Sequence, residues 1–422
     1  MDALFQIVTM IIPKAGVQLG GAPLTLNILL LAIVLLRNPN QTVLSIQQCK
    51  DIGICYAVLF VFGLITFCFD LVDGTGAYQL AQIATVVASP LAGVIALRMK
   101  PERSFRILCI ALIIVNLYAV LQYTVGITQT SIAGLTYTYG QDLQSKPIGY
   151  GMSTESSALK MPSTYQNGNS SGIFAALGIS LILMWRPTIS NWKALRYVAI
   201  GCGILGIMLC GSRSIIIPFV LVVIPLLVQR YRVTQSRMKS TYLVAAVTAI
   251  IGGVLYLMVY QRGIVEQFFS RNVQQTLSDP TASGRTNQWS DMWLSITQLD
   301  GGKLLRLMFF GQGTNYGLGG EGLPTFFATF GFFSTVAFYG MLVAAMIYLW
   351  KDERTKTVAL GVFCLFFAFC VDSSFYYPPN VMMVFIIVGF AIRAAQEPTV
   401  DNVTGVMHAH RPRALKRHKE FA

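Results

Sequence analysis

Long apolar runs separated by polar connections dominate the chain. Several of them reach the ~17–25 residues that a helix needs to cross a bilayer. Eleven are clear: residues 22–36, 52–69, 77–97, 105–125, 171–185, 194–210, 214–229, 241–260, 325–350, 357–371 and 380–394. A twelfth segment, 4–12, is short and ends at Pro13-Lys14, so it either crosses with tilt or dips in and returns. The pattern predicts an all-α polytopic membrane protein with about 12 transmembrane helices, 11 of them clear.

Composition supports a membrane location. The chain is 54% apolar and only 12% charged, whereas soluble domains carry roughly 25% charged residues. The start, Met1-Asp2-Ala3-Leu4, has no basic region, so no cleaved signal peptide is expected. Eight cysteines lie in or beside apolar runs without any Cys-x-x-Cys pair. They are typical of apolar packing, and neither a disulfide framework, a metal site nor a cofactor is expected.

The basic residues predict how the chain is oriented. Their alternation places 22 of the 31 lysines and arginines on one side, which the positive-inside rule makes cytoplasmic. Both termini are then cytoplasmic if the short first segment crosses. Because the net charge of +13 resides in short loops and the tail, it does not indicate nucleic-acid binding.

The same alternation predicts the domain organisation. We expect a single transmembrane domain over residues 1–395, followed by a basic cytoplasmic tail over 396–422. Two long outer loops, about 126–170 and 261–324, are rich in Tyr, Asn, Ser, Thr and Gly and are expected to contain short helices. Loops of this length are often functional.

Arg213 lies in the short break Gly211–Ser214 between two apolar runs, on the outer side. A guanidinium stays charged and presents five donors in a fork that fits phosphate. The hydroxyls of Ser212 and Ser214 would add donors. A single arginine there is also typical of a headgroup-level anchor that snorkels to lipid phosphates.

The second outer loop supplies another candidate arginine. Ser283-Gly284 breaks the chain, and residues 285–299 predict an amphipathic helix with Trp289, Trp293 and Ile296 on one face. Arg285 would lie in its first turn, beside unpaired amides that favour an anion. The alternative is a surface arginine near a helix start.

Further candidates lie around these two arginines. Arg306 is another outer cation, and Gly311 and Gly313 begin a glycine-rich turn that follows no βαβ strand, so a ligand-side turn is favoured over a dinucleotide site. Tyr165, Asn167 and Asn169 offer an aromatic face and amides to sugars, although tyrosines also form interfacial belts. Gly201-x-Gly203-x-x-Gly206, inside an apolar run, predicts close helix packing.

Carboxylates are the expected source of a catalytic base, because all three histidines lie in the tail. The outer acids are Asp70, Asp73, Asp142, Glu155, Glu266, Asp279, Asp291, Asp300, Glu321 and Asp372.

These residues together resemble the O-antigen polymerase and ligase superfamily of bacterial envelope glycan assembly. The motifs that carry the resemblance are Gly211-Ser-Arg-Ser214, Ser283-Gly-Arg285 with Trp289, Phe310-Gly-Gln-Gly313, Phe326 to Gly331 and Tyr165-Gln-Asn-Gly-Asn169. Each motif is short, so the resemblance rests on their order, spacing and topology. It covers most of residues 20–395 and is strongest over 160–345.

The resemblance implies a metal-independent glycosyltransferase in the bacterial inner membrane, with its site on the periplasmic face. Its donor would be an undecaprenyl-diphosphate-linked glycan embedded among membrane lipids, and Arg213 and Arg285 would hold the diphosphate. Ser212, Ser214, Ser283, Trp289, Tyr165, Asn167, Asn169, Arg306, Gly311 and Gly313 would contact substrate. A chain-length regulator and a flippase of the same pathway are candidate partners.

One departure separates the branches of this superfamily. Ligases that attach glycan to lipid A-core carry a histidine after the glycine-rich stretch, whereas this chain reads Gly319-Gly-Glu321-Gly-Leu-Pro324. Glu321 is the nearest candidate base, and a loop glutamate without a role is its alternative. The departure favours a Wzy-type polysaccharide polymerase over a ligase or other oligosaccharyltransferase. A lipid-linked glycan flippase is a third hypothesis, but no internal repeat supports it.

Overall fold

The computed structural model describes residues 1–47, 49–143, 148, 160–185, 187, 189–221, 285–312, 321–376 and 378–396. Within these ranges the chain is mostly helical, and its one sheet is a two-stranded hairpin. The helices are α1 (Asp2–Ile11), α2 (Leu26–Arg37), α3 (Pro39–Gln47), α4 (Lys50–Val72), α5 (Ala77–Ala88), α6 (Pro90–Ala96), α7 (Pro101–Val125), α8 (Ile127–Thr130), α9 (Gly168–Ile182), α10 (Ser190–Leu209), α15 (Arg285–Thr297), α16 (Gly301–Phe310), α17 (Leu323–Trp350), α18 (Lys356–Val371), the 3₁₀ turn η2 (Ser373–Tyr376) and α19 (Pro378–Gln396).

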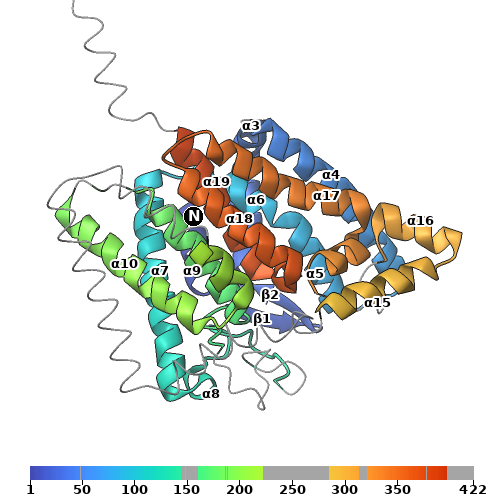
Figure 1. Cartoon of the computed structure of the whole chain (residues 1–422), viewed down its shortest axis with the longest axis horizontal. Coiled ribbons are helices and arrows are strands. Elements are labelled where there is room, and N and C mark those ends of the chain that lie inside the picture. The colour runs from blue at the N-terminus through green and yellow to red at the C-terminus, as the bar shows by residue number, and fades with distance from the viewer. Residues whose placement is uncertain are drawn as a thin grey trace, which may run out of the picture.

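Helix α9 lies at the centre of the fold. All fifteen of its residues are buried, and α7, α10, α18 and α19 pack around it. On the other side of the molecule α4 packs along α17, and α15 and α16 lie at the end opposite α10 (Figure 1). Because α9 is buried on every face, the polar side chains of its first turn need partners other than bulk solvent.

The predicted number of about 12 crossings is wrong for the part of the chain described. By length and composition, five helices there could cross a membrane, or six if the bent pair α2–α3 counts as one span. The five are α4, α5–α6 taken together, α7, α10 and α17. Four other apolar helices, α1, α9, α18 and α19, have apolar stretches of only 10–17 residues. At 1.5 Å per residue, helices of 10–17 residues fall short of a hydrocarbon core of about 30 Å.

The structure is therefore that of a multi-pass membrane protein with fewer full-length spans than its apolar runs suggest. An apolar run measures hydrophobicity and not helix length, and several runs here belong to helices that are enclosed by other helices. The expected segment 241–260 lies outside the described residues.

The helix in the predicted segment 22–36 is shorter than expected, because the first residues of that segment form a strand. β1 (Gly16–Leu19) and β2 (Ala22–Thr25) form an antiparallel hairpin closed by Gly20-Gly21. Both glycines have positive φ, 56° and 83°, as two-residue hairpin turns require. Gln18 N donates to Tyr139 O at 2.9 Å, so the hairpin is tied to the 126–170 loop.

The predicted glycine packing in α10 is confirmed at two of the three positions. A Cβ on Gly203 would lie 2.8 Å from the Ile179 side chain, and one on Gly206 would overlap Oδ1 of Asn116. Gly201 has nothing within 4 Å of that position. Gly203 and Gly206 therefore let α10 approach α9 and α7 closely.

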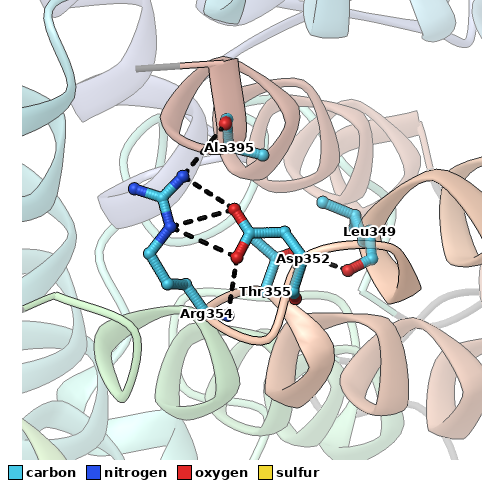
Figure 2. A network of polar contacts seen from close by, with 5 residues as sticks. All are labelled: Leu349, Asp352, Arg354, Thr355 and Ala395. Atoms are coloured by element: carbon cyan, nitrogen blue, oxygen red, sulfur yellow. Dashed lines mark hydrogen bonds and ion pairs between the residues drawn. The ribbon is translucent and has the colours of Figure 1, made fainter. Parts of the chain in front are cut away.

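The connection between α17 and α18 is held by one arginine (Figure 2). Arg354 donates to Oδ2 of Asp352 from Nε at 2.9 Å and from Nη2 at 2.7 Å, and Nη2 also reaches the carbonyl of Ala395 at 3.2 Å. These hydrogen bonds lower the pKa of Asp352 below its ordinary value. The end of α19 is thereby tied to the turn before α18.

Candidate functional site

A helix start at Arg213 forms one wall of the candidate site. Ser212 accepts the first helical hydrogen bond from Ile216 N at 2.9 Å, so Arg213 is the first residue of the helical turn. The hydroxyls of Ser212 and Ser214 are buried and lie 3.0 Å apart. Arg213 itself is half-buried. The predicted group Ser212–Arg213–Ser214 is therefore a compact helix start, where amides and the helix dipole favour an anion.

The start of α9 packs directly on this turn. A Cβ on Gly168 would overlap the carbonyl oxygen of Cys210, and one on Gly172 would lie 2.6 Å from Sγ of Cys210. Met161 N also donates to Leu209 O at 3.0 Å. Glycine at 168 and 172 thus allows two helix starts, that of α9 and that at Arg213, to meet.

The N-cap of α9 carries the predicted amides. Asn167 accepts from Ser170 N at 2.9 Å, which caps the helix. Asn169 is buried, and its Nδ2 donates to Oδ2 of Asp372. Within the described ranges, Oδ1 of Asn169 and the buried hydroxyls of Ser170 and Ser171 have no hydrogen-bond partner. Buried polar atoms left in this way require an explanation, and a polar ligand or water would provide one.

Asp372 is the residue that sequence reasoning did not single out. It follows α18 and is 5% exposed. Its Oδ1 accepts from the hydroxyl of Ser374, while Oδ2 accepts from Asn169. Asn380, on α19, donates to Ser374 O at 3.0 Å. Both carboxylate oxygens of Asp372 are therefore engaged by neighbouring side chains.

The loop that carries Glu321 joins the same network. Gly322 N donates to the hydroxyl of Ser373 at 3.1 Å, and a Cβ on Gly322 would overlap the carbonyl oxygen of Cys370. Gly322 has φ +74°, a conformation that favours glycine. Glu321 is therefore held beside the turn that bears Asp372, and its side chain is half-buried.

Tyr165 has a structural place in this arrangement. Its hydroxyl donates to Met10 O at 2.9 Å, its ring stacks on Phe174 with centroids 5.3 Å apart, and it is 1% exposed. Complete burial raises the pKa of Tyr165 well above its ordinary value, so the phenol remains a donor. The structure thus gives this ring no face open to a sugar, in contrast to the prediction.

The segment before α9 is fixed by a glutamine of α7. Gln122 accepts from Ser163 N at 2.7 Å and donates to Ser163 O at 3.1 Å. Ser163 has φ 54°, which is unusual outside glycine. This double hydrogen bond fixes the segment that leads to Asn167. Gln122 and Ser163 are 41 residues apart in the sequence, so no local pattern predicts their pairing.

The α15–α16 pair is a separate arm that docks on α4 and α17. Arg306 pairs with Asp73 at 2.5 Å and lies 4.9 Å from the centre of the Phe69 ring. Gln312 N donates to Ala328 O at 2.7 Å. Gly311 has φ +76°, and a Cβ there would overlap the carbonyl oxygen of Thr329. Arg306 and Gly311 are thus used in docking this arm, and no contact described joins them to Arg213.

The predicted helix after Ser283-Gly284 is present as α15, and of its predicted apolar face, Trp289, Trp293 and Ile296, only Ile296 is buried. Met292 and Ile296 are buried against Leu307 and Ala328. Trp289 and Trp293 are exposed, the latter by 66%. Arg285 begins α15. Its side chain, together with Ser283 and Gly313, lies outside the described residues.

The site therefore brings together four segments from distant parts of the chain: 160–171, 211–216, 321–322 and 372–374. Among the described residues no group of three or more His, Cys, Asp or Glu side chains could hold a metal. The turn that begins at Arg213 packs on the first turn of α9, where Asn169 pairs with Asp372 and the Ser170 and Ser171 hydroxyls have no partner among the described residues. A site of this composition can hold an anionic group and offer a carboxylate to accept a proton. In comparisons with known proteins, no protein-family model matches this chain, and no curated protein matches it either.

Proposed function

We propose that this protein is a membrane glycosyltransferase that polymerises undecaprenyl-diphosphate-linked repeat units into surface polysaccharide at the periplasmic face. The observation that carries the proposal is the packing of the Arg213 helix start on the first turn of α9 through Gly168 and Gly172. Asn169 of that first turn hydrogen-bonds Asp372, and in this proposal the Arg213 helix start binds the anion beside this pair. The motifs that resemble the O-antigen polymerase and ligase superfamily supply the substrate class.

In this proposal Arg213 and Arg285 hold the diphosphate of the donor. An acceptor hydroxyl oxygen attacks the anomeric carbon, the bond from that carbon to the diphosphate oxygen breaks, and the lipid diphosphate leaves with the electron pair. Fixed cations aimed at the developing negative charge stabilise such a transition state. Two guanidiniums can do this without a metal ion.

Glu321 takes the proton of the acceptor hydroxyl. Of the two carboxylates in the site, Asp372 is almost fully buried and accepts hydrogen bonds at both oxygens, whereas Glu321 is half-buried. A general base must come within hydrogen-bond reach of the proton that it removes. Asp372 is accordingly a positioning residue, which holds Asn169 and Ser374 in place.

A polymerase is favoured over a ligase because the position after the glycine-rich stretch bears Glu321 instead of histidine. The acceptor of a polymerase is a second lipid-linked repeat unit. Purified protein given only lipid-linked repeat should therefore form polymer without any other acceptor. Formation of product only after a lipid A-core acceptor is added would contradict this choice.

The test is Arg213→Ala and Arg285→Ala, scored for glycan chain length with the membrane level of each variant measured. Both variants should leave single repeats, since the leaving diphosphate has lost a cation. Arg213→Lys should also fail, because an ammonium cannot make the two-pronged contact, whereas a headgroup anchor would tolerate lysine. Arg103→Ala, at an exposed position on α7, is the matched control. Normal polymer from both alanine variants would refute the assigned role.

The two carboxylates are separated by a second pair of variants. Glu321→Gln should lower kcat and remove the fall in rate at acidic pH, because that limb of the pH profile reports protonation of the base. Asp372→Asn should lower activity while the pH profile keeps its shape. A pH profile unchanged in Glu321→Gln would remove Glu321 from this role.

A further inference from the structure

An apolar groove lies between α3, α4, α6, α17 and α19, away from the candidate site. The space between these helices is about 530 Å³ when the open solvent at its mouth is included. The walls are almost wholly apolar and include Ile46, Tyr56, Leu97, Met341 and Ile392. Since α4, α5–α6 and α17 are candidate membrane spans, the groove lies between helices that face hydrocarbon.

Next in sequence to the lining residue Leu97 is an arginine, Arg98, whose guanidinium has nitrogens without a hydrogen-bond partner among the described residues. Arg98 directly follows the lining residue Leu97, and its Nη1 reaches only the carbonyl of Asn38, at 3.4 Å. Its Nε and Nη2 are buried without a hydrogen-bond partner in the part of the chain that the structure describes. A buried donor on a charged group costs free energy unless an acceptor satisfies it. Arg354 shows the contrast, because Asp352 engages both its Nε and its Nη2.

Helix α3 connects this arginine to the groove. It is bent by 92° from α2, begins next to Asn38, and contributes Ser45 and Ile46 to the groove wall. Seven residues of helix span about 10 Å. Arg98 thus lies within about one headgroup's reach of the apolar walls. Arg393 follows the lining residue Ile392, and its Nε is likewise buried and unpartnered in the described ranges.

We infer that this groove binds an anionic glycerophospholipid of the surrounding membrane, with an acyl chain along the apolar walls and the phosphate at Arg98. The walls are almost wholly apolar, so they offer a sugar few hydrogen-bond partners. The charge is complementary at Arg98 and Arg393, whose buried guanidinium nitrogens include ones without a partner among the described residues. Basic pockets between membrane helices on the cytoplasmic side suit anionic headgroups.

The experiment measures lipid retained by the full-length protein. The protein is purified from vesicles that contain equal amounts of phosphatidylglycerol and phosphatidylcholine, and the retained lipids are counted by native mass spectrometry. The wild-type protein should prefer phosphatidylglycerol by about 5-fold or more, the effect of one basic residue near an anionic headgroup. Arg98→Gln should reduce this preference to within about twofold of unity. Lys100→Gln, an exposed charge two residues away, should leave it unchanged.

A second variant tests the groove itself. Cys49 lines it and is half-buried, so Cys49→Phe should reduce the retention of both lipids while Arg98 is still present. If Arg98→Gln fails to reach the membrane, Arg98→Lys, which keeps the charge, should retain the preference. The inference is overturned if Arg98→Gln keeps the preference for phosphatidylglycerol, or if Lys100→Gln loses as much of that preference as Arg98→Gln does. It is also overturned if Cys49→Phe retains both lipids in full, or if a polyprenyl phosphate displaces phosphatidylglycerol completely. None of these outcomes depends on glycan polymerisation.

Discussion

Gly172 is a position where the proposed site is sensitive to a single methyl group. An alanine Cβ there would lie 2.6 Å from Sγ and 2.9 Å from Cβ of Cys210, and 3.0 Å from Cδ1 of Ile215. Comfortable contacts between such atoms are about 3.5–4.0 Å. The Arg213 turn and α9 must therefore separate by about 1 Å. Cys210 cannot easily yield, because it is 1% exposed and its thiol is hydrogen-bonded to Ile207 O at 3.0 Å.

The magnitude follows from this overlap. Overpacking a well-filled core costs about 1–3 kcal/mol, while replacing glycine by alanine in a helix gains up to about 1 kcal/mol. Gly201→Ala, on α10, carries the same helix gain without any overlap, since nothing lies within 4 Å of its Cβ position. The difference between Gly172→Ala and Gly201→Ala in free energy of unfolding is therefore the overpacking term, about 1–3 kcal/mol.

Two measurements check the expectation. Thermal unfolding of the purified variants in detergent should place Gly172→Ala below Gly201→Ala by a few degrees, roughly 2–4 °C per kcal/mol for 150–250 residues and less for a longer chain. Glycan polymerisation by Gly172→Ala should fall by up to about 10²-fold, because a displacement of 1 Å disturbs the catalytic geometry. If Gly172→Ala unfolds at or above the temperature of Gly201→Ala, the close contact described is not a feature of the protein.

Three other predictions follow from contacts elsewhere in the fold. Gly206→Ala should lower the unfolding temperature, because its Cβ would overlap the buried Asn116 side chain, and Asn116→Ala should partly restore it. Tyr165→Phe should cost about 1 kcal/mol in unfolding free energy, since the carbonyl that accepts from Tyr165 loses its donor; glycan length should not change at equal protein level. The pKa of Asp352 is lowered in the folded protein by Arg354, so the ion pair stabilises fully above an unfolded pKa of about 3.9 and its contribution is lost as pH falls through the folded pKa. Asp352→Asn should therefore lose less stability than the wild-type protein when unfolding is followed from pH 6 to pH 3.

The helical class and the positions of most helices could be predicted from apolar periodicity, because burial and hydrocarbon both select long apolar runs. Helix α4 begins within a few residues of its expected segment, and so does α17. The number of full crossings could not be predicted in the same way. α9 and α18 are as apolar as a helix that crosses a membrane, yet they have only 15 and 16 residues. Both are packed among other helices, and hydropathy does not distinguish an apolar protein interior from lipid.

The candidate site shows a similar division. The compact turn around Arg213 was predictable because its residues are adjacent in sequence. Asp372 was one of ten outer acids, and its pairing with Asn169 joins residues 203 apart, which no local pattern encodes. On α15 the predicted apolar face held Trp289, Trp293 and Ile296. The structure buries Ile296 together with Met292, which meet Leu307 of α16 and Ala328 of α17, and leaves both tryptophans exposed.

Gly311 and Gly331 have a consequence beyond the docking of one arm. They share nearly the same backbone conformation, with φ 76° at each, and a Cβ on Gly331 would lie 2.5 Å from the amide nitrogen of Gly311. The segments that contain Gly311 and Gly331 cross there so closely that neither position has room for a side chain. A residue larger than glycine at either position would therefore push the two segments apart. Chains that keep this fold are therefore expected to show paired glycines twenty positions apart, even where their charged residues differ. Such a spacing would identify distant relatives that short polar motifs do not reveal.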